Sequence, residues 1–260
     1  MISLPTRPNV TRASRVPSLL IFDVDGVLVD TRGSFQKTTL EAVRLFTGHH
    51  GTRAELHRWK NRPGFNDDWK LSHAWVRSLG GRFEYEEVKA RFQEIYWGEN
   101  GGGNVARERW LLPKASLTRL ARMAELAIFT GRTRHELDYS LDRWNVRRYF
   151  RRIMTMESVK RGKPDPEGLF QILDGRDPKQ AVYVGDNVDD ALAAQAADMP
   201  FVGVLPLRSE ERRQRIRRLG SLAALTILGT VRDLERFLIR RQRLRPSSRT
   251  PVPTPKQTKG

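Results

Sequence analysis

The chain has 260 residues, which is enough for one large domain or for a core with a smaller module. It has no cysteine and no run of roughly 18 apolar residues, so the sequence argues against disulfides, thiolate metal sites and an apolar membrane span. The formal net charge is +17, and most of the excess lies near the two ends of the chain.

Residues 1–17 are polar and contain three arginines, which predicts a flexible lead without a secretory signal and therefore a cytoplasmic protein. An apolar run of strand length follows at 18–24, and Asp23 and Asp25 stand at its end. Side chains two positions apart in a strand point the same way, so both carboxylates are expected at the ligand-binding edge of a buried sheet. A divalent cation would relieve their repulsion. Taken alone, the motif also occurs by chance and in calcium-binding loops.

Residues 33–112 contain helical patterns only, in three apolar stripes. The second stripe, for example, includes Trp69, Trp75 and Leu79. This stretch predicts an all-helical module of about 80 residues inserted after the first strand.

Strand-length apolar runs then alternate with helical patterns. The runs lie at 126–130, 153–156, 181–184, 201–204 and, more weakly, 222–228. Strands that are apolar on both faces and alternate with helices predict an α/β fold with a parallel sheet covered on both sides.

Thr130 and Gly131 stand at the end of the second apolar strand. A hydroxyl followed by an unhindered backbone N–H at a strand–helix turn suits phosphate oxygens. The alternative is that Thr130 or Thr133 only begins the next helix as its N-cap. Farther on, Pro164 discourages helix at Lys163 and holds this lysine in an extended segment, where it could offset negative charge or remain a solvated surface residue.

Asp186, Asp189 and Asp190 stand where the strand at 181–184 meets an alanine-rich helix. Acidic residues in a first helical turn often serve only the helix dipole and the N-cap, an explanation that suits Asp189 better than Asp186. Together the motifs supply hard oxygen ligands without His or Cys, which favours magnesium over zinc.

Twelve arginines between residues 207 and 245 form two arginine-dense helical patterns. Such density can bind nucleic acid or another polyanion, and it can equally be the solvated face of helices that pack on the core. Residues 244–260 are rich in Pro, Ser, Thr and Lys, which predicts a disordered basic tail.

The order of these motifs resembles the haloacid dehalogenase superfamily. The matching residues are DVDGVLVD at 23–30, TGR at 130–132, KPDP at 163–166 and GDNVDD at 185–190. The resemblance covers roughly residues 18–241. It implies a Rossmann-like parallel-sheet core over 18–32 and 113–243, with a helical cap over 33–112 as in the phosphoglycolate phosphatase and β-phosphoglucomutase branch.

The resemblance also implies a phosphatase that hydrolyses a small phosphorylated metabolite through an aspartyl-phosphate. Asp23 is implied as the nucleophile, and Asp25 as the acid for the leaving group and then the base for water. Thr130 and the N–H of Gly131 would hold the phosphoryl group, and Lys163 would neutralise it.

The implied cofactor is Mg²⁺. Its ligands would be Asp23, the backbone carbonyl of Asp25, and Asp186. Asp190 would lie on a metal-bound water or on Lys163.

Candidate substrate contacts in the inserted module lie between Lys60 and Lys70, with Arg62, Asn66 and Lys70 as the main choices. The alternative for Asn66 and Asp67 is that they begin a helix as its N-cap.

A phosphomutase or a phosphonatase would use the same core, and the sequence leaves both open. A dehalogenase of this superfamily would lack the acid at Asp25. The substrate and the oligomeric state are not readable from the sequence.

Overall fold

A computed structural model describes residues 17–62, 64–65, 67–205, 212–222 and 224–243. Residues 1–16 of the predicted lead at 1–17, the predicted tail at 244–260 and Asn66 lie outside these residues.

A six-stranded parallel sheet forms the core, in the order β5-β4-β1-β6-β7-β8. Its strands are β1 (Leu19–Phe22), β4 (Glu125–Phe129), β5 (Phe150–Met154), β6 (Ala181–Gly185), β7 (Phe201–Val204) and β8 (Thr226–Leu228). The predicted α/β class is therefore confirmed. Two predicted strands were misplaced, because β5 begins three residues earlier than expected and β8 is confined to the end of the weak 222–228 run.

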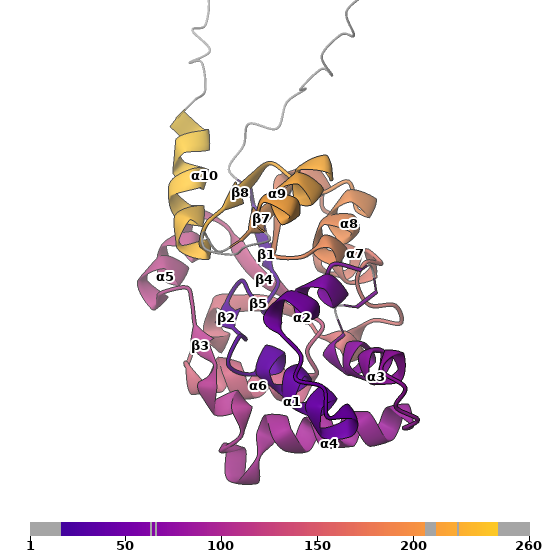
Figure 1. The fold of residues 1–260 in the computed structure, drawn as a ribbon. Coiled ribbons are helices and arrows are strands. Elements are labelled where there is room, and N and C mark those ends of the chain that lie inside the picture. The colour runs from indigo at the N-terminus through magenta and orange to yellow at the C-terminus, as the bar shows by residue number, and fades with distance from the viewer. Residues whose placement is uncertain (1–16, 63, 66, 206–211, 223, 244–260) are drawn as a thin grey trace, which may run out of the picture.

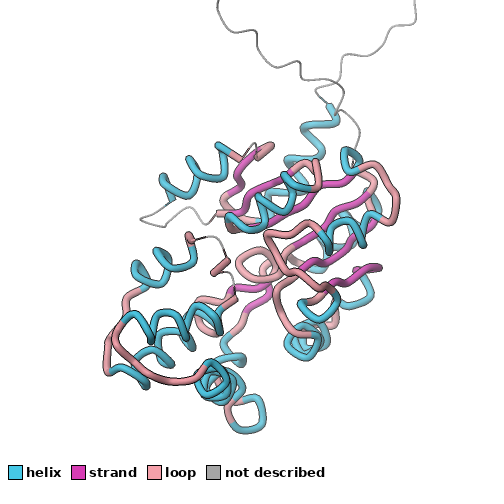
Figure 2. The backbone as a smooth tube through the Cα atoms, turned by 90° about the vertical axis from the view of Figure 1, so that its right-hand side faces the viewer, coloured by secondary structure: helices cyan, strands magenta, loops and turns pink. Residues whose placement is uncertain are grey.

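Helices cover both faces of this sheet (Figures 1 and 2). One face packs against α5 (Lys114–Met123), α6 (Arg134–Arg143) and α10 (Leu234–Arg243), and the other against α7 (Glu167–Leu173), α8 (Val188–Ala196) and α9 (Arg212–Ser221). Strand β1 is apolar throughout because both of its faces are buried. Leu20 and Phe22 belong to the apolar cluster on one face of the sheet, and Leu19 and Ile21 belong to the cluster on the other.

Four α-helices form a separate layer at the lower end of Figure 1. They are α1 (Phe35–Thr47), α2 (Arg53–Lys60), α3 (Asp68–Ser78) and α4 (Tyr85–Trp97), and we call them the helical module. The module has its own apolar clusters, one around Phe35 and Phe92 and another around Val43 and Trp75. Short 3₁₀ helices lie at η1 (Glu99–Gly101), η2 (Asn104–Arg107), η3 (Arg147–Tyr149), η4 (Met156–Ser158), η5 (Pro178–Gln180) and η6 (Val231–Asp233).

A two-stranded antiparallel sheet joins the helical module to the core, and the sequence did not predict it. It pairs β2 (Val29–Asp30) with β3 (Arg109–Trp110), so the expectation of purely helical structure over 33–112 is wrong at its end. Strands of two residues carry no periodic pattern. Asp30 accepts hydrogen bonds from Arg32 at 2.7 and 2.8 Å and from Arg109 at 2.8 Å, which ties the two crossing segments together.

No helix among the described residues has the length and apolar character that a bilayer crossing requires.

Candidate active site

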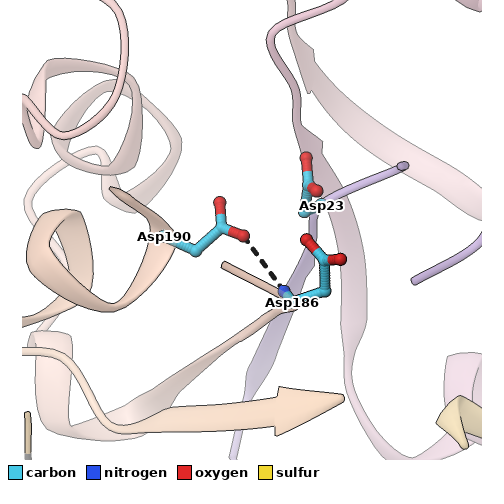
Figure 3. Close-up of side chains that lie close together, drawn as sticks. All are labelled: Asp23, Asp186 and Asp190. Carbon is cyan, nitrogen blue, oxygen red and sulfur yellow. Dashed lines mark hydrogen bonds between the residues drawn. The ribbon is translucent and has the colours of Figure 1, made fainter. Parts of the chain in front are cut away.

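The predicted acidic residues meet at the carboxyl ends of neighbouring strands. Asp23 follows β1 and Asp186 follows β6, which pairs directly with β1. Asp190 lies in the first turn of α8. Carboxylate oxygens of these three residues lie within 4.8 Å of one another, as Figure 3 shows.

Lys163 lies between two of these carboxylates. Its Nζ donates to Oδ1 of Asp23 and to Oδ1 of Asp190, each at 2.7 Å, and to the hydroxyl of Tyr183 at 3.0 Å. The side chain is 2% exposed. Burial alone lowers the pKa of Lys163, but Asp190 and Asp23 outweigh it and raise the pKa, so the ammonium is firmly held.

Both oxygens of Asp190 already have protein partners. Oδ1 accepts from Lys163 and from Tyr183, while Oδ2 accepts from the backbone N–H groups of Asp186 and Asn187 at 3.1 and 3.3 Å. A Cβ at Gly185 would lie 2.5 Å from the Asp190 side chain, so glycine lets this carboxylate approach the strand end. Asp190 is thus suited to fixing Lys163 and the turn, which leaves Asp23 and Asp186 to face an ion.

The donor set fits a magnesium ion. Burial raises the pKa of Asp23 well above its usual range, and Asp190, Asp25 and Asp186 add to that effect while Lys163 opposes it. When all three carboxylates are ionised, one ammonium leaves two negative charges uncompensated, which together with burial is why the pKa of Asp23 rises without an ion. A divalent cation bound through oxygen would offset them, and no His or Cys belongs to the cluster.

A buried arginine holds Asp25. The Arg132 side chain is 1% exposed, and its Nε and Nη2 donate to Oδ1 of Asp25 at 2.9 and 2.7 Å. The same guanidinium donates to both carboxylate oxygens of Glu108 at 2.7 and 3.2 Å, and to Ser140 at 2.7 Å. Neither Arg132 nor Glu108 was predicted to have a role. Only the position of Arg132, directly after Gly131, marked it as near the site.

Thr130 is buried at the end of β4, and its hydroxyl accepts from the backbone N–H of Arg132 at 3.2 Å. Thr133, not Thr130, is the N-cap of α6, where its side chain accepts from the N–H of Glu136 in a capping box. Thr130 is thus not used for helix capping.

A cavity lies between the strand ends and the helical module. Its lining residues are Asp23, Asp25, Phe35, Lys60, Asp67, Asp68, Trp69, Gly131, Arg132, Glu136 and Met156. The module therefore meets the carboxylates at the sheet edge. A further contact comes from the backbone N–H of Gly64, which lies 3.3 Å from the Asp189 carboxylate, so Asp189 faces the module.

The candidate contacts chosen from the 60–70 segment divide into two groups. Lys60 and Asp67 line the cavity, and Asp67 is also the N-cap of α3. Arg62 and Lys70 do not line it. The Arg62 guanidinium lies 4.3 Å from the centre of the Trp59 ring, and the Lys70 side chain is 65% exposed.

Comparisons with known proteins place the chain near phosphatases and related hydrolases. The family model for haloacid dehalogenase-like hydrolases matches residues 114–204. Phosphoglycolate phosphatase 1 of Pseudomonas aeruginosa is 29% identical over 196 residues, which are 71% of this chain and 68% of that protein. An imidazoleglycerol-phosphate dehydratase of Phytophthora nicotianae is 32% identical over 202 residues, 74% of this chain, and the chain spans only 44% of its length.

Solved structures share the fold. A phosphonoacetaldehyde hydrolase-like protein from Oleispira antarctica superposes with a TM-score of 0.67 at 18% identity, covering 92% of this chain and 97% of that one. CbbY from Rhodobacter sphaeroides, determined in complex with phosphate, gives a TM-score of 0.62 at 19% identity and covers 84% and 96%.

Proposed function

We propose that the chain is a haloacid dehalogenase-like hydrolase that acts as a Mg²⁺-dependent phosphatase of small phosphate monoesters. The observation that carries this proposal is the placement of Asp23, whose carboxylate lies 2.7 Å from Lys163 and within 4.8 Å of the Asp186 and Asp190 carboxylates. A nucleophilic carboxylate needs such surroundings, because a phosphate dianion otherwise repels it.

The reaction proceeds in two steps on Asp23. In the first, a carboxylate oxygen of Asp23 forms a bond to phosphorus while the ester P–O bond breaks, and Asp25 gives a proton to the leaving alcohol. In the second, Asp25 takes a proton from a water molecule that attacks the aspartyl-phosphate. The bond to Asp23 then breaks, which yields inorganic phosphate and the free carboxylate.

The other residues at the strand ends hold the transferred group. The Thr130 hydroxyl and the backbone N–H of Gly131 bind phosphoryl oxygens, and Lys163 offsets their charge. Asp23, the Asp25 carbonyl and Asp186 would hold Mg²⁺, which would supply charge stabilisation for the phosphoryl oxygens. The helical module serves as a cap that encloses the reacting groups and excludes water.

A phosphonatase is less well supported than a phosphatase. Its Schiff-base lysine must lose a proton, and Lys60 is the lysine among the lining residues of the cavity. Burial lowers the pKa of Lys60, but the carboxylates of Asp68, Asp25 and Asp186 together outweigh burial and raise that pKa. A lysine held in its charged form is a poor amine nucleophile.

Phosphate release from p-nitrophenyl phosphate, with and without Mg²⁺, tests the proposal. We expect activity that disappears on metal chelation and in Asp23→Asn. Asp198→Asn is the matched control, because this aspartate is 79% exposed in a left-handed turn that asparagine tolerates. Activity that persists in a folded Asp23→Asn protein would refute the assignment of the nucleophile.

A further inference from the structure

Acidic side chains line the part of the cavity that the helical module and α6 contribute. Asp67 and Asp68 from the helical module and Glu136 from α6 line it, together with the apolar surfaces of Phe35 and Met156. With Asp23 and Asp25, the cavity lining contains five carboxylates against two cationic side chains.

Both of those cations are already neutralised by protein carboxylates. Lys60 lies 2.9 Å from the carboxylate of Asp68, and the pair is largely buried, with side chains 21% and 13% exposed. Arg132 is shared between Asp25 and Glu108, each at 2.7 Å. Among the described residues that line the cavity, no cation is left to receive a negatively charged leaving group.

The hydrogen bonds that Asp67 and Glu136 accept come from uncharged donors in the described structure. The carboxylate of Asp67 accepts from the backbone N–H groups of Trp69 and Lys70 at 2.9 and 3.2 Å, and the exposed Lys70 ammonium lies 3.6 Å away. Glu136 accepts from the N–H of Thr133 and from the amide of Gln93. The cavity lining therefore has more carboxylates than cationic side chains, and burial raises the pKa of Glu136 while Arg132 opposes that rise.

A second observation points to a ligand at the same place. Trp69 lines the cavity and is 8% exposed, and its indole N–H is buried with no acceptor among the described residues. A buried donor without a partner is costly, so a ligand oxygen or nitrogen that accepts from it would be favoured. Hydroxyl groups meet both demands, because they accept from the indole and donate to carboxylates.

We propose that the substrate is a phosphate monoester whose leaving alcohol carries hydroxyl or ammonium groups and no carboxylate. This inference rests on the proposed phosphatase function. It implies that phosphoglycolate, the substrate named for the phosphoglycolate phosphatase relatives, is a poor substrate of this chain. The carboxylate of a glycolate leaving group would meet Asp67 and Glu136 and would find no free cation to pair with.

Three phosphate esters of similar size test the proposal. Ethanolamine phosphate presents an ammonium, glycerol 3-phosphate presents hydroxyls, and phosphoglycolate presents a carboxylate. We expect kcat/KM for each of the first two to exceed that for phosphoglycolate at least tenfold. Equal or higher kcat/KM for phosphoglycolate would overturn the proposal.

The double variant Asp67→Asn with Glu136→Gln removes both charges and keeps both helix-capping interactions, since Asn is a good N-cap and Gln completes a capping box. In this variant, we expect kcat/KM for ethanolamine phosphate and for glycerol 3-phosphate to exceed that for phosphoglycolate by less than threefold. An unchanged preference would show that these carboxylates do not select the substrate, and would overturn the proposal.

Binding measurements test this inference independently of the proposed phosphatase activity. Calorimetric titration of the three esters into Asp23→Asn with Mg²⁺ reports affinity without turnover, and phosphoglycolate should bind at least tenfold more weakly than the other two. Inactivity of the unmutated protein toward p-nitrophenyl phosphate would refute the phosphatase assignment, whereas the order of these affinities would still decide the inference.

Discussion

Replacing Arg132 by methionine should destabilise the protein strongly, and the loss should depend on Glu108. The two side chains are 1% and 0% exposed and lie 2.7 Å apart, so the substitution leaves a carboxylate buried without its cation. Breaking such a pair costs about 3–5 kcal/mol. Asp25 is 33% exposed and can be solvated, so most of the cost should come from Glu108.

The companion variant Glu108→Gln removes the charge but keeps oxygen and nitrogen atoms near Ser34 and Tyr96, whose hydroxyls donate to Glu108 at 3.0 and 3.1 Å. We expect it to cost about 1–3 kcal/mol. The double variant should be more stable than the sum of the single losses predicts, with a coupling of about 1–3 kcal/mol. Urea unfolding monitored by tryptophan fluorescence gives all four free energies of the cycle.

The exposed pair of Arg147 with Asp138 is the control, because their side chains are 41% and 37% exposed and lie 2.6 Å apart. Its coupling should stay below about 1 kcal/mol. If the losses at Arg132 and Glu108 simply add, the claim that an uncompensated buried charge dominates the cost is wrong.

Two further predictions concern the join between the layers and the packing of α7. Hydrogen bonds from two arginines hold the pKa of Asp30 well below its usual range, so its stabilisation is present above about pH 4 and is lost as the pH falls through its folded pKa. In urea unfolding, the stability gap between the unmutated protein and Asp30→Asn should therefore shrink from pH 7 to pH 3, and a constant gap would contradict this. Gly168→Ala places a Cβ 2.3 Å from the Phe129 ring and should cost about 1–3 kcal/mol, whereas Gly162→Ala, with nothing within 4 Å, should be nearly neutral; equal thermal midpoints would contradict it.

The sheet and its acidic edge could be predicted because their signals are local. Strands β1, β4, β6 and β7 consist mainly of apolar residues, and Asp23, Thr130 and Asp186 follow directly after β1, β4 and β6. The carboxyl ends of parallel strands lie on one edge, so the sequence order of these motifs implies their convergence. Lys163 was harder to place, since its loop is not a strand end, but Pro164 limited its conformation.

The buried contacts of Arg132 and Glu108 near this edge could not be predicted in the same way, because their partners lie far away along the chain. Arg132 reaches Glu108 across 24 positions, and Glu108 reaches Ser34 across 74. An arginine or glutamate in a sequence is expected at the surface, and only the packed structure shows that this pair is buried.

The predicted substrate contacts in the helical module also depended on side-chain positions that the sequence does not reveal. A phosphate substrate suggests cationic partners, so Arg62 and Lys70 were natural choices, yet Lys60 is the module cation that lines the cavity. Lys60 is in turn neutralised by Asp68. In the proposed function, Lys163 and a bound metal ion already offset the charge of the phosphate, so a further free cation in the module would serve only a charged leaving group. The ion pair of Lys60 with Asp68 therefore supports a leaving alcohol that carries no carboxylate.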